Sequence, residues 1–151
     1  IMATGDNALT GLHVARATSI TGTDASKALI LATRGEDKLE WVSAASTVAS
    51  HEDGEGAPSS SGSSNIVPIP YDATAMARLA TDGYDLCMTG ESFRAAVAHD
   101  ERTLAAVQHV RVYARMAPED KEAVLRAMKE RGLHTLMCGD GAIRCYGKEL
   151  N

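Results

Sequence analysis

Residues 111–140 constrain the fold of this 151-residue chain more than any other stretch, because their hydrophobic period changes twice within a short run. A β-prone segment at residues 110–113 leads to Pro118, which suits the first turn of a helix. Apolar residues then recur at helical spacing until Gly132. Residues 133–138 are again mostly apolar and run into a Gly-Asp-Gly sequence. This order predicts a strand, a helix and a second strand, which together form one βαβ crossover.

Polar residues stand at the predicted carboxyl ends of these strands, where the ligands of parallel sheets collect. Arg115 follows the first strand, Asp140 follows the second, and Lys121 lies between them at the head of the helix. A carboxylate beside glycine can reach Mg²⁺, and a lysine and an arginine neutralise phosphoryl oxygens. The three residues therefore favour phosphate chemistry, although a simple turn and a solvated lysine are the commoner explanations of each feature alone.

A second strand tip is predicted at the start of the chain. Residues 1–3 are apolar, Thr4, Gly5 and Asp6 break the run, and Asn7 is placed to cap a following helix. This tip therefore carries a hydroxyl, a glycine and a carboxylate.

Three motifs in this order resemble the phosphorylation domain of P-type ATPases, which belongs to the haloacid dehalogenase superfamily. The matching pieces are Met-Ala-Thr-Gly-Asp-Asn at residues 2–7, Ala-Arg-Met-Ala-Pro-Glu-Asp-Lys at 114–121 and Met-Cys-Gly-Asp-Gly at 137–141. The fuller sequence around each motif is similar to the type V ATPases, and within them to the A subgroup of the endoplasmic reticulum. Residues 86–90 extend the resemblance to the centre of the chain.

The resemblance implies an α/β fold of the haloacid-dehalogenase (Rossmann-type) kind, with a parallel sheet and flanking helices. It also implies a role for each matched residue. Thr4 and Gly5 would contact the phosphoryl group, Asp6 and Arg115 the nucleotide, Lys121 both nucleophile and phosphate, and Asp140 would hold Mg²⁺; Thr4 and Lys121 would be catalytic. In such an ATPase, ATP forms an aspartyl phosphate whose hydrolysis drives transport or removal of a transmembrane helix. The segment would then lie at the cytosolic face of the endoplasmic reticulum membrane, with ATP and the other ATPase domains as partners.

Two departures from the family pattern bear on activity. The nucleophilic aspartate of the family's Asp-Lys-Thr-Gly-Thr motif is absent from the chain. The family's Gly-Asp-Gly-Thr-Asn-Asp reads Gly-Asp-Gly-Ala-Ile-Arg at residues 139–144, so a cation replaces the second carboxylate near the metal. At a few ångströms this exchange weakens Mg²⁺ binding by on the order of several kcal/mol.

We therefore expect an incomplete phosphorylation domain at residues 1–141, a divergent tail at residues 142–151 and no catalysis by the chain alone. Two alternatives stay open from the residues themselves. One is a free-standing haloacid-dehalogenase-type phosphatase, and the other is a non-catalytic module that binds phosphate or nucleotide.

The central part of the chain is predicted to hold an insertion. Residues 27–32 and 39–42 are β-prone and are joined by a polar turn, which predicts a hairpin. Residues 49–65 carry almost no apolar side chains, so nothing offsets the entropy of ordering them. We interpret them as a flexible loop inside one domain.

Composition excludes other classes of protein. A net charge of -5 and few aromatic residues argue against a nucleic-acid partner. The three cysteines lack metal-ligand spacing, which indicates buried reduced thiols and a cytosolic environment. No apolar run is long enough to insert into a membrane.

A further motif at residues 89–92, Thr-Gly-Glu-Ser, matches the dephosphorylation loop of the P-type ATPase actuator domain. In the family that loop precedes the phosphorylated aspartate, whereas here the motif lies between residues 2–7 and 114–121, which match the second and third motifs of the phosphorylation domain. It also follows a predicted strand at residues 84–89. We therefore interpret Thr89 or Ser92 as a helix cap, as Asp72 is for an earlier helix.

Overall fold

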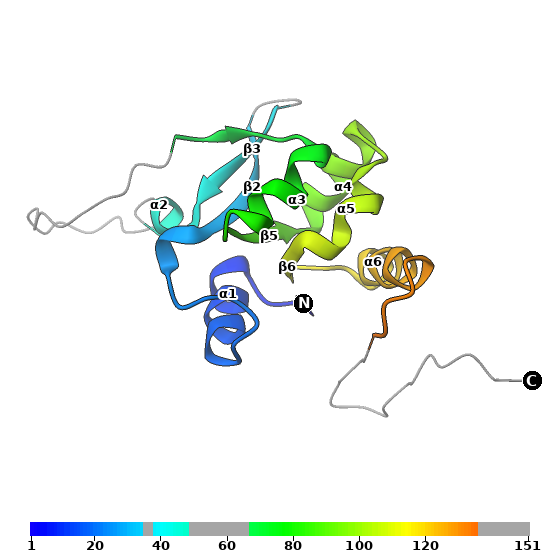
Figure 1. The fold of residues 1–151 in the computed structure, drawn as a ribbon, viewed down its shortest axis with the longest axis horizontal. Coiled ribbons are helices and arrows are strands. Elements are labelled where there is room, and N and C mark those ends of the chain that lie inside the picture. The colour runs from blue at the N-terminus through cyan, green and yellow to red at the C-terminus, as the bar shows by residue number, and fades with distance from the viewer. Residues whose placement is uncertain (35–37, 49–66, 136–151) are drawn as a thin grey trace, which may run out of the picture.

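The computed structural model describes residues 1–34, 38–48 and 67–135 (Figure 1). Within them a six-stranded sheet has the order β1-β6-β5-β2-β3-β4. The strands are β1 (Met2–Ala3), β2 (Ala28–Arg34), β3 (Lys38–Ser43), β4 (Ile69–Pro70), β5 (Asp85–Thr89) and β6 (Val110–Ala114). The helices are α1 (Ala8–Ala17), α2 (Ala44–Val48), α3 (Met76–Thr81), α4 (Gly90–His99), α5 (Thr103–Ala106) and α6 (Pro118–Glu130). Three 3-10 turns accompany them: η1 (Ala25–Lys27), η2 (Ala73–Ala75) and η3 (Val107–His109).

The sheet is mixed and mostly parallel, which confirms the predicted α/β class. Strands β1, β6, β5 and β2 run parallel, and β2, β3 and β4 are antiparallel neighbours. The predicted hairpin is confirmed by β2 and β3, which pair from Leu29 with Ser43 to Arg34 with Lys38. The parallel part therefore carries the strand tips that the sequence pointed to, and the antiparallel part extends the sheet away from them.

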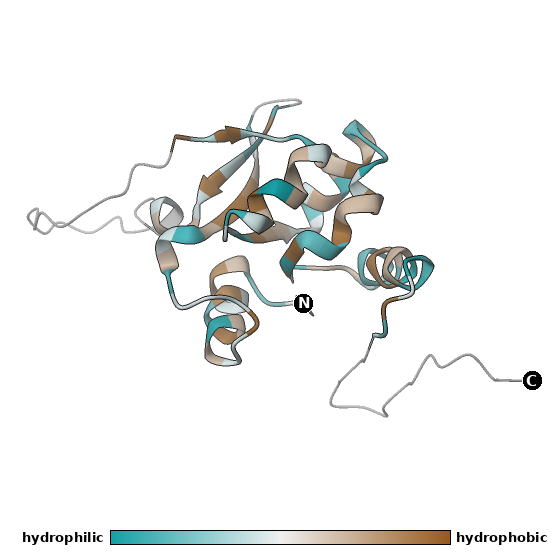
Figure 2. Cartoon of the chain, in the orientation of Figure 1, coloured by the Kyte–Doolittle hydropathy of each residue, from teal (hydrophilic) through white to brown (hydrophobic). Residues whose placement is uncertain are grey.

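Helices cover both faces of the sheet. Figure 1 shows α1 on one side of the strands and α3, α4 and α5 on the other. The strands serve both layers because successive side chains point to opposite faces. In β2, Leu29 and Leu31 join the core under α3 to α6, while Ala28 and Ile30 join the core under α1. Figure 2 shows apolar residues concentrated in the strands and hydrophilic residues on the outer turns of the helices.

Local side-chain caps begin the helices where the sequence predicts them. The Asn7 side chain accepts a hydrogen bond from the Thr10 N–H at 2.9 Å and begins α1. Asp72 caps η2, which leads directly into α3. Thr89 and Ser92 form a capping box at the start of α4, so the predicted structural role of this motif is confirmed.

One predicted element is not found in the described residues. Residues 133–135 form no strand, and the rest of the predicted strand at 133–138 lies outside the described ranges. Helix α6 ends instead in a turn at Gly132, which takes the left-handed φ of 73° and so stops the helix as predicted. The loop at residues 49–65 and the tail at residues 142–151 also lie outside the described part of the chain.

Candidate functional site

The carboxyl ends of β1, β6 and β5 form one edge of the sheet. Their parallel register places Ala3 beside Tyr113, and Thr89 beside Ala114. Three turns therefore leave the sheet side by side: the turn at residues 4–6, the turn at residues 115–117, and the start of α4.

The structure brings the first two predicted tips into direct contact through the backbone. The Arg115 N–H donates to the Asp6 carbonyl at 2.8 Å, and the Met116 N–H donates to the Thr4 carbonyl at 3.1 Å. The Thr4 N–H continues the pairing of the strands by donating to the Tyr113 carbonyl at 2.8 Å. Segments from the two ends of the described chain thus build one continuous rim.

The Thr4–Asp6 turn is held by its own side chains. The Thr4 hydroxyl donates to the Asp6 carboxylate at 2.9 Å and accepts from the Asp6 N–H at 3.1 Å. Gly5 between them faces open space, because a Cβ built there has no atom within 4 Å. The fold therefore does not require glycine at this position, and the backbone of the turn is open to a ligand.

Arg115 has an unusual backbone conformation. Its φ is 48°, a left-handed value that costs a residue with a side chain on the order of 1 kcal/mol. Met116, which is buried directly after it, and the hydrogen bond to Asp6 hold the turn in place. The Arg115 side chain is exposed and makes no hydrogen bond or ion pair with the described residues. Its guanidinium is therefore available to an anion.

Lys121 lies in the first turn of α6, close behind the Arg115 turn. Its N–H donates to the Ala117 carbonyl at 3.0 Å, and its partly buried side chain has no polar partner within the described ranges. Because the N-terminus of a helix carries partial positive charge, the lysine adds to an already positive end of α6. Asp140 lies outside the described residues, so its position relative to Lys121 is not part of this geometry.

The third strand tip adds residues for which the sequence predicted no role at this site. Gly90 begins α4 against the Arg115 turn, and Arg94, one turn later, pairs with the buried carboxylate of Asp120. The signal in the sequence was faint: a glycine directly after a strand, and an aspartate at the third position of α6. Neither pattern reveals that α4 and α6 meet.

The described donor groups fit a phosphoryl group better than a metal ion. No group of three or more His, Cys, Asp or Glu able to hold a metal is found among the residues that the structure describes. The first tip supplies the single carboxylate of Asp6, already bonded to Thr4. Hydroxyl, backbone N–H, guanidinium and ammonium groups, by contrast, are the donors that phosphoryl oxygens accept from.

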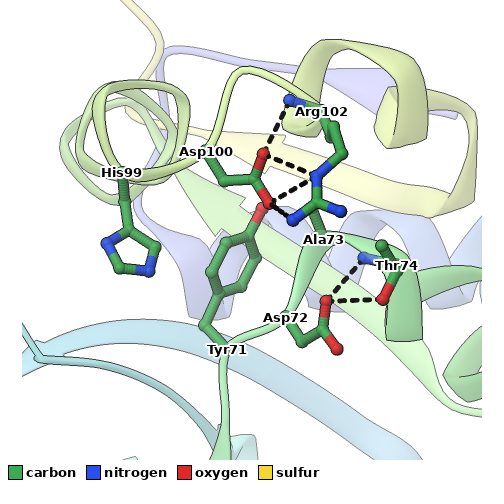
Figure 3. Close-up of a pocket in the computed structure, with 7 residues that line it drawn as sticks. All are labelled: Tyr71, Asp72, Ala73, Thr74, His99, Asp100 and Arg102. Atoms are coloured by element: carbon green, nitrogen blue, oxygen red, sulfur yellow. Dashed lines mark hydrogen bonds and ion pairs between the residues drawn. The ribbon is translucent and has the colours of Figure 1, made fainter.

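A separate hollow of about 440 Å³ lies at the opposite end of α4 (Figure 3). Its lining residues are Tyr71, Asp72, Ala73, Thr74, His99, Asp100 and Arg102. Hydrogen bonds from the Thr74 side chain and backbone hold the pKa of Asp72 below its usual value. Hydrogen bonds from Arg102 do the same for the pKa of Asp100. Both carboxylates are therefore engaged in local turns.

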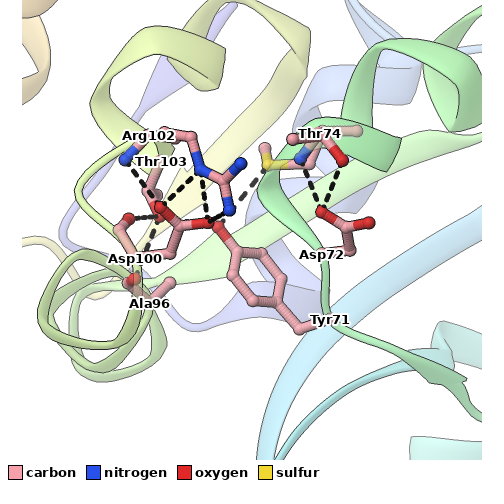
Figure 4. Close-up of polar contacts among 8 residues, drawn as sticks. Tyr71, Asp72, Thr74, Ala96, Asp100, Arg102 and Thr103 are labelled. Carbon is pink, nitrogen blue, oxygen red and sulfur yellow. Dashed lines mark hydrogen bonds and ion pairs between the residues drawn. The ribbon is translucent and has the colours of Figure 1, made fainter.

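Tyr71 anchors β4 to the helices beside this hollow (Figure 4). Its hydroxyl pairs with the Thr103 hydroxyl at 2.7 Å, and Thr103 in turn lies 3.0 Å from the Ala96 carbonyl of α4. Burial is the main cause that raises the pKa of Tyr71. The polar groups of the hollow thus join β4, α4 and α5, which accounts for them as structural contacts.

Comparison with known proteins identifies the family of the chain. No family model matches it. It is 34% identical over 142 residues to the probable manganese-transporting ATPase PDR2 of Arabidopsis thaliana. It is 34% identical over 148 residues, and 30% over 143 residues, to the endoplasmic reticulum transmembrane helix translocases of Saccharomyces cerevisiae and Schizosaccharomyces pombe.

Each of these alignments covers 93% of this chain but only 10% of the relative, so the chain spans about a tenth of the length of the proteins that it matches. None of the helices in the described ranges is both long enough and apolar enough to cross a membrane. The chain belongs to the family of type V P-type ATPases.

Proposed function

We propose that this chain is part of the phosphorylation domain of a type V P-type ATPase of the endoplasmic reticulum subgroup. The protein that contains it couples ATP hydrolysis, through an aspartyl phosphate, to transport or to removal of a transmembrane helix from that membrane. The observation that carries the proposal is the direct backbone contact between the Thr4–Asp6 turn and the Arg115 turn at the carboxyl edge of the sheet. Similarity along 93% of the chain supports it.

The residues of the two turns have different binding roles. The Gly5 backbone approaches the phosphoryl group, because no side chain stands in its way. The Thr4 hydroxyl, which donates a hydrogen bond to the Asp6 carboxylate in this structure, turns to donate to a phosphoryl oxygen instead. Asp6 and Arg115 then face the nucleotide. At an effective dielectric of about 20, a cation 4 Å from a phosphoryl charge contributes about 4 kcal/mol of attraction.

Lys121 serves catalysis by neutralising charge between the attacking carboxylate and the phosphoryl group. Its ammonium has no competing partner in the described part of the chain, so it remains free for this contact. The attacking aspartate comes from another part of the ATPase. In the complete ATPase Asp140 would hold Mg²⁺, which would supply further neutralisation of the phosphate, and Arg144 in place of the family's second carboxylate would weaken that binding. The isolated chain is therefore inactive, and its partners are ATP and the remaining domains of the same ATPase on the cytosolic face of the membrane.

The test begins with the transcript on both sides of residues 1 and 141. We expect Asp-Lys-Thr-Gly-Thr upstream and apolar spans beyond. The full-length protein, given radiolabelled ATP, should then form an acid-stable phosphoenzyme that hydroxylamine removes. Lys121→Ala should reduce it at least 100-fold (about 2.7 kcal/mol), while Lys129→Ala, on the exposed end of the same helix, should leave it unchanged.

Other outcomes would support the alternatives. Phosphatase activity of the 151-residue chain on p-nitrophenyl phosphate would support a free-standing phosphatase. Binding of ATP by the same chain without turnover, together with a full-length protein that forms no phosphoenzyme, would support a binding module.

A further inference from the structure

The N-terminus of α4 is packed unusually closely against the turn that carries Arg115. A Cβ built on Gly90 would lie 2.6 Å from the Arg115 carbonyl oxygen and 2.7 Å from the Asp120 carboxylate. Real Cβ atoms essentially never approach other atoms so closely, so only glycine fits here without a shift. Helix α4 and the segment from Arg115 to Asp120 are therefore in direct contact.

Asp120 connects the two helices at this contact. Its Oδ2 accepts hydrogen bonds from the Arg94 guanidinium at 2.5 Å and from the Ala117 N–H at 3.1 Å. The Asp120 side chain is only 7% exposed, whereas that of Arg94 is 59% exposed. One oxygen thus binds the start of α6 to α4, while the Arg94 side chain stays mostly exposed.

The turn at residues 115–117 is consequently held from both sides. On one side the carbonyls of Thr4 and Asp6 accept its backbone N–H groups. On the other side Arg94 and Asp120 fix its junction with α6. A left-handed residue such as Arg115 persists only where its surroundings determine its conformation.

We propose that Arg94 and Asp120 are positioning residues for the phosphate site. They hold the turn at residues 115–117 and thereby fix the positions of the Arg115 and Lys121 backbones, whose side chains bring positive charge to the phosphoryl group. The inference rests on the proposed function for the meaning of those charges. A positioned cation loses effect rapidly when its geometry relaxes, because catalysis depends on small displacements.

Helix α6 supplies a matched control. Arg126 pairs with Glu122 at 2.7 Å in an exposed ion pair on the same helix, away from the turn. Arg126→Gln removes an arginine pair without touching residues 115–117. Arg94→Lys keeps a cation near Asp120 and serves as the conservative variant.

The first experiment is native-state hydrogen exchange by NMR on the 151-residue chain. In Arg94→Gln, the amides of Arg115 and Met116 should exchange at least 10-fold faster, while amides in β2 and β5 keep their rates. Arg94→Lys should restore most of the protection, and Arg126→Gln should change neither amide. Unchanged exchange at the two amides, or an equal rise across the sheet, would overturn the inference.

The second experiment measures the rate of phosphoenzyme formation in the full-length ATPase. Arg94→Gln should lower that rate about 10-fold, Arg94→Lys should recover most of it, and Arg126→Gln should match the wild type. If Lys121→Ala abolishes the phosphoenzyme but Arg94→Gln does not slow it, the positioning role is wrong while the proposed function stands. If the wild type forms no phosphoenzyme, the proposed function fails, and the positioning role fails with it.

Discussion

Gly90→Ala tests directly how tightly α4 packs against the Arg115 turn. The added methyl group would begin 2.6 Å from a backbone oxygen and 2.7 Å from a carboxylate oxygen. The backbone oxygen cannot rotate away, and the Asp120 carboxylate is held by Arg94 and the Ala117 N–H. To reach even the shortest separation that Cβ atoms tolerate, 3.0 Å, helix and turn must separate by about 0.4 Å (3.0 − 2.6).

The expected cost follows from two opposing terms. Forcing an extra methyl group into a packed contact costs about 1–3 kcal/mol. Replacing glycine by alanine in a helix returns up to about 1 kcal/mol, and less at a first position. We therefore expect the free energy of unfolding to fall by about 1–2 kcal/mol, which lowers Tm by about 2–8 °C for a domain of this size.

Urea unfolding measures this change through the fluorescence of Trp41, which is the single tryptophan and is fully buried. Gly5→Ala is the matched control, because its Cβ would meet no atom within 4 Å. It should change the free energy of unfolding by less than about 0.5 kcal/mol. If Gly90→Ala proves as stable as Gly5→Ala, the contact relaxes freely and the reasoning is refuted.

Three further predictions concern buried and capping groups. Hydrogen bonds from Thr74 lower the pKa of Asp72, so the stabilisation that this carboxylate contributes is present above its unfolded pKa of about 4 and is lost as pH falls through the folded pKa. In acid unfolding of Asp72→Asn, the free energy of unfolding should therefore depend less steeply on pH in that range. Burial raises the pKa of Cys87 to about 12, so peptide mass spectrometry should find it unlabelled by iodoacetamide at pH 8 unless urea is present. Tyr113→Phe leaves the Val107 carbonyl without its 2.8 Å hydrogen bond and should cost about 1–3 kcal/mol in urea unfolding.

The features that the sequence predicted well are those decided within a few residues. Asn7, Asp72 and Thr89 each accept a hydrogen bond from a backbone N–H two or three residues ahead. Such caps depend only on residue type and spacing, so they can be predicted without knowledge of the fold. The hairpin of β2 and β3 was predictable for the same reason, because its strands are close in sequence.

The arrangement of the site depends on contacts that sequence spacing does not encode. Arg115 was predictable as a strand-tip residue, but its contact with Asp6 requires β1 and β6 to be parallel neighbours. The contact of Gly90 with Asp120 requires in addition that β5 lies beside β6 and that α4 turns back over the sheet. These are long-range pairings, set by the packing of whole elements rather than by local propensity.

Two tips of the sheet, those of β1 and β5 on either side of β6, contain Thr-Gly followed by an acidic residue, and the structure gives their glycines opposite explanations. Gly90 is enclosed, with backbone and carboxylate oxygens inside the space of a Cβ, so packing alone accounts for it. Gly5 is open on every side that its Cβ would face, so packing leaves it unexplained. An open glycine, in a turn that contacts the Arg115 turn through its backbone, leaves room for close approach by a phosphoryl group. The same sequence pattern therefore serves structure at residues 89–91, and we propose a chemical role for it at residues 4–6.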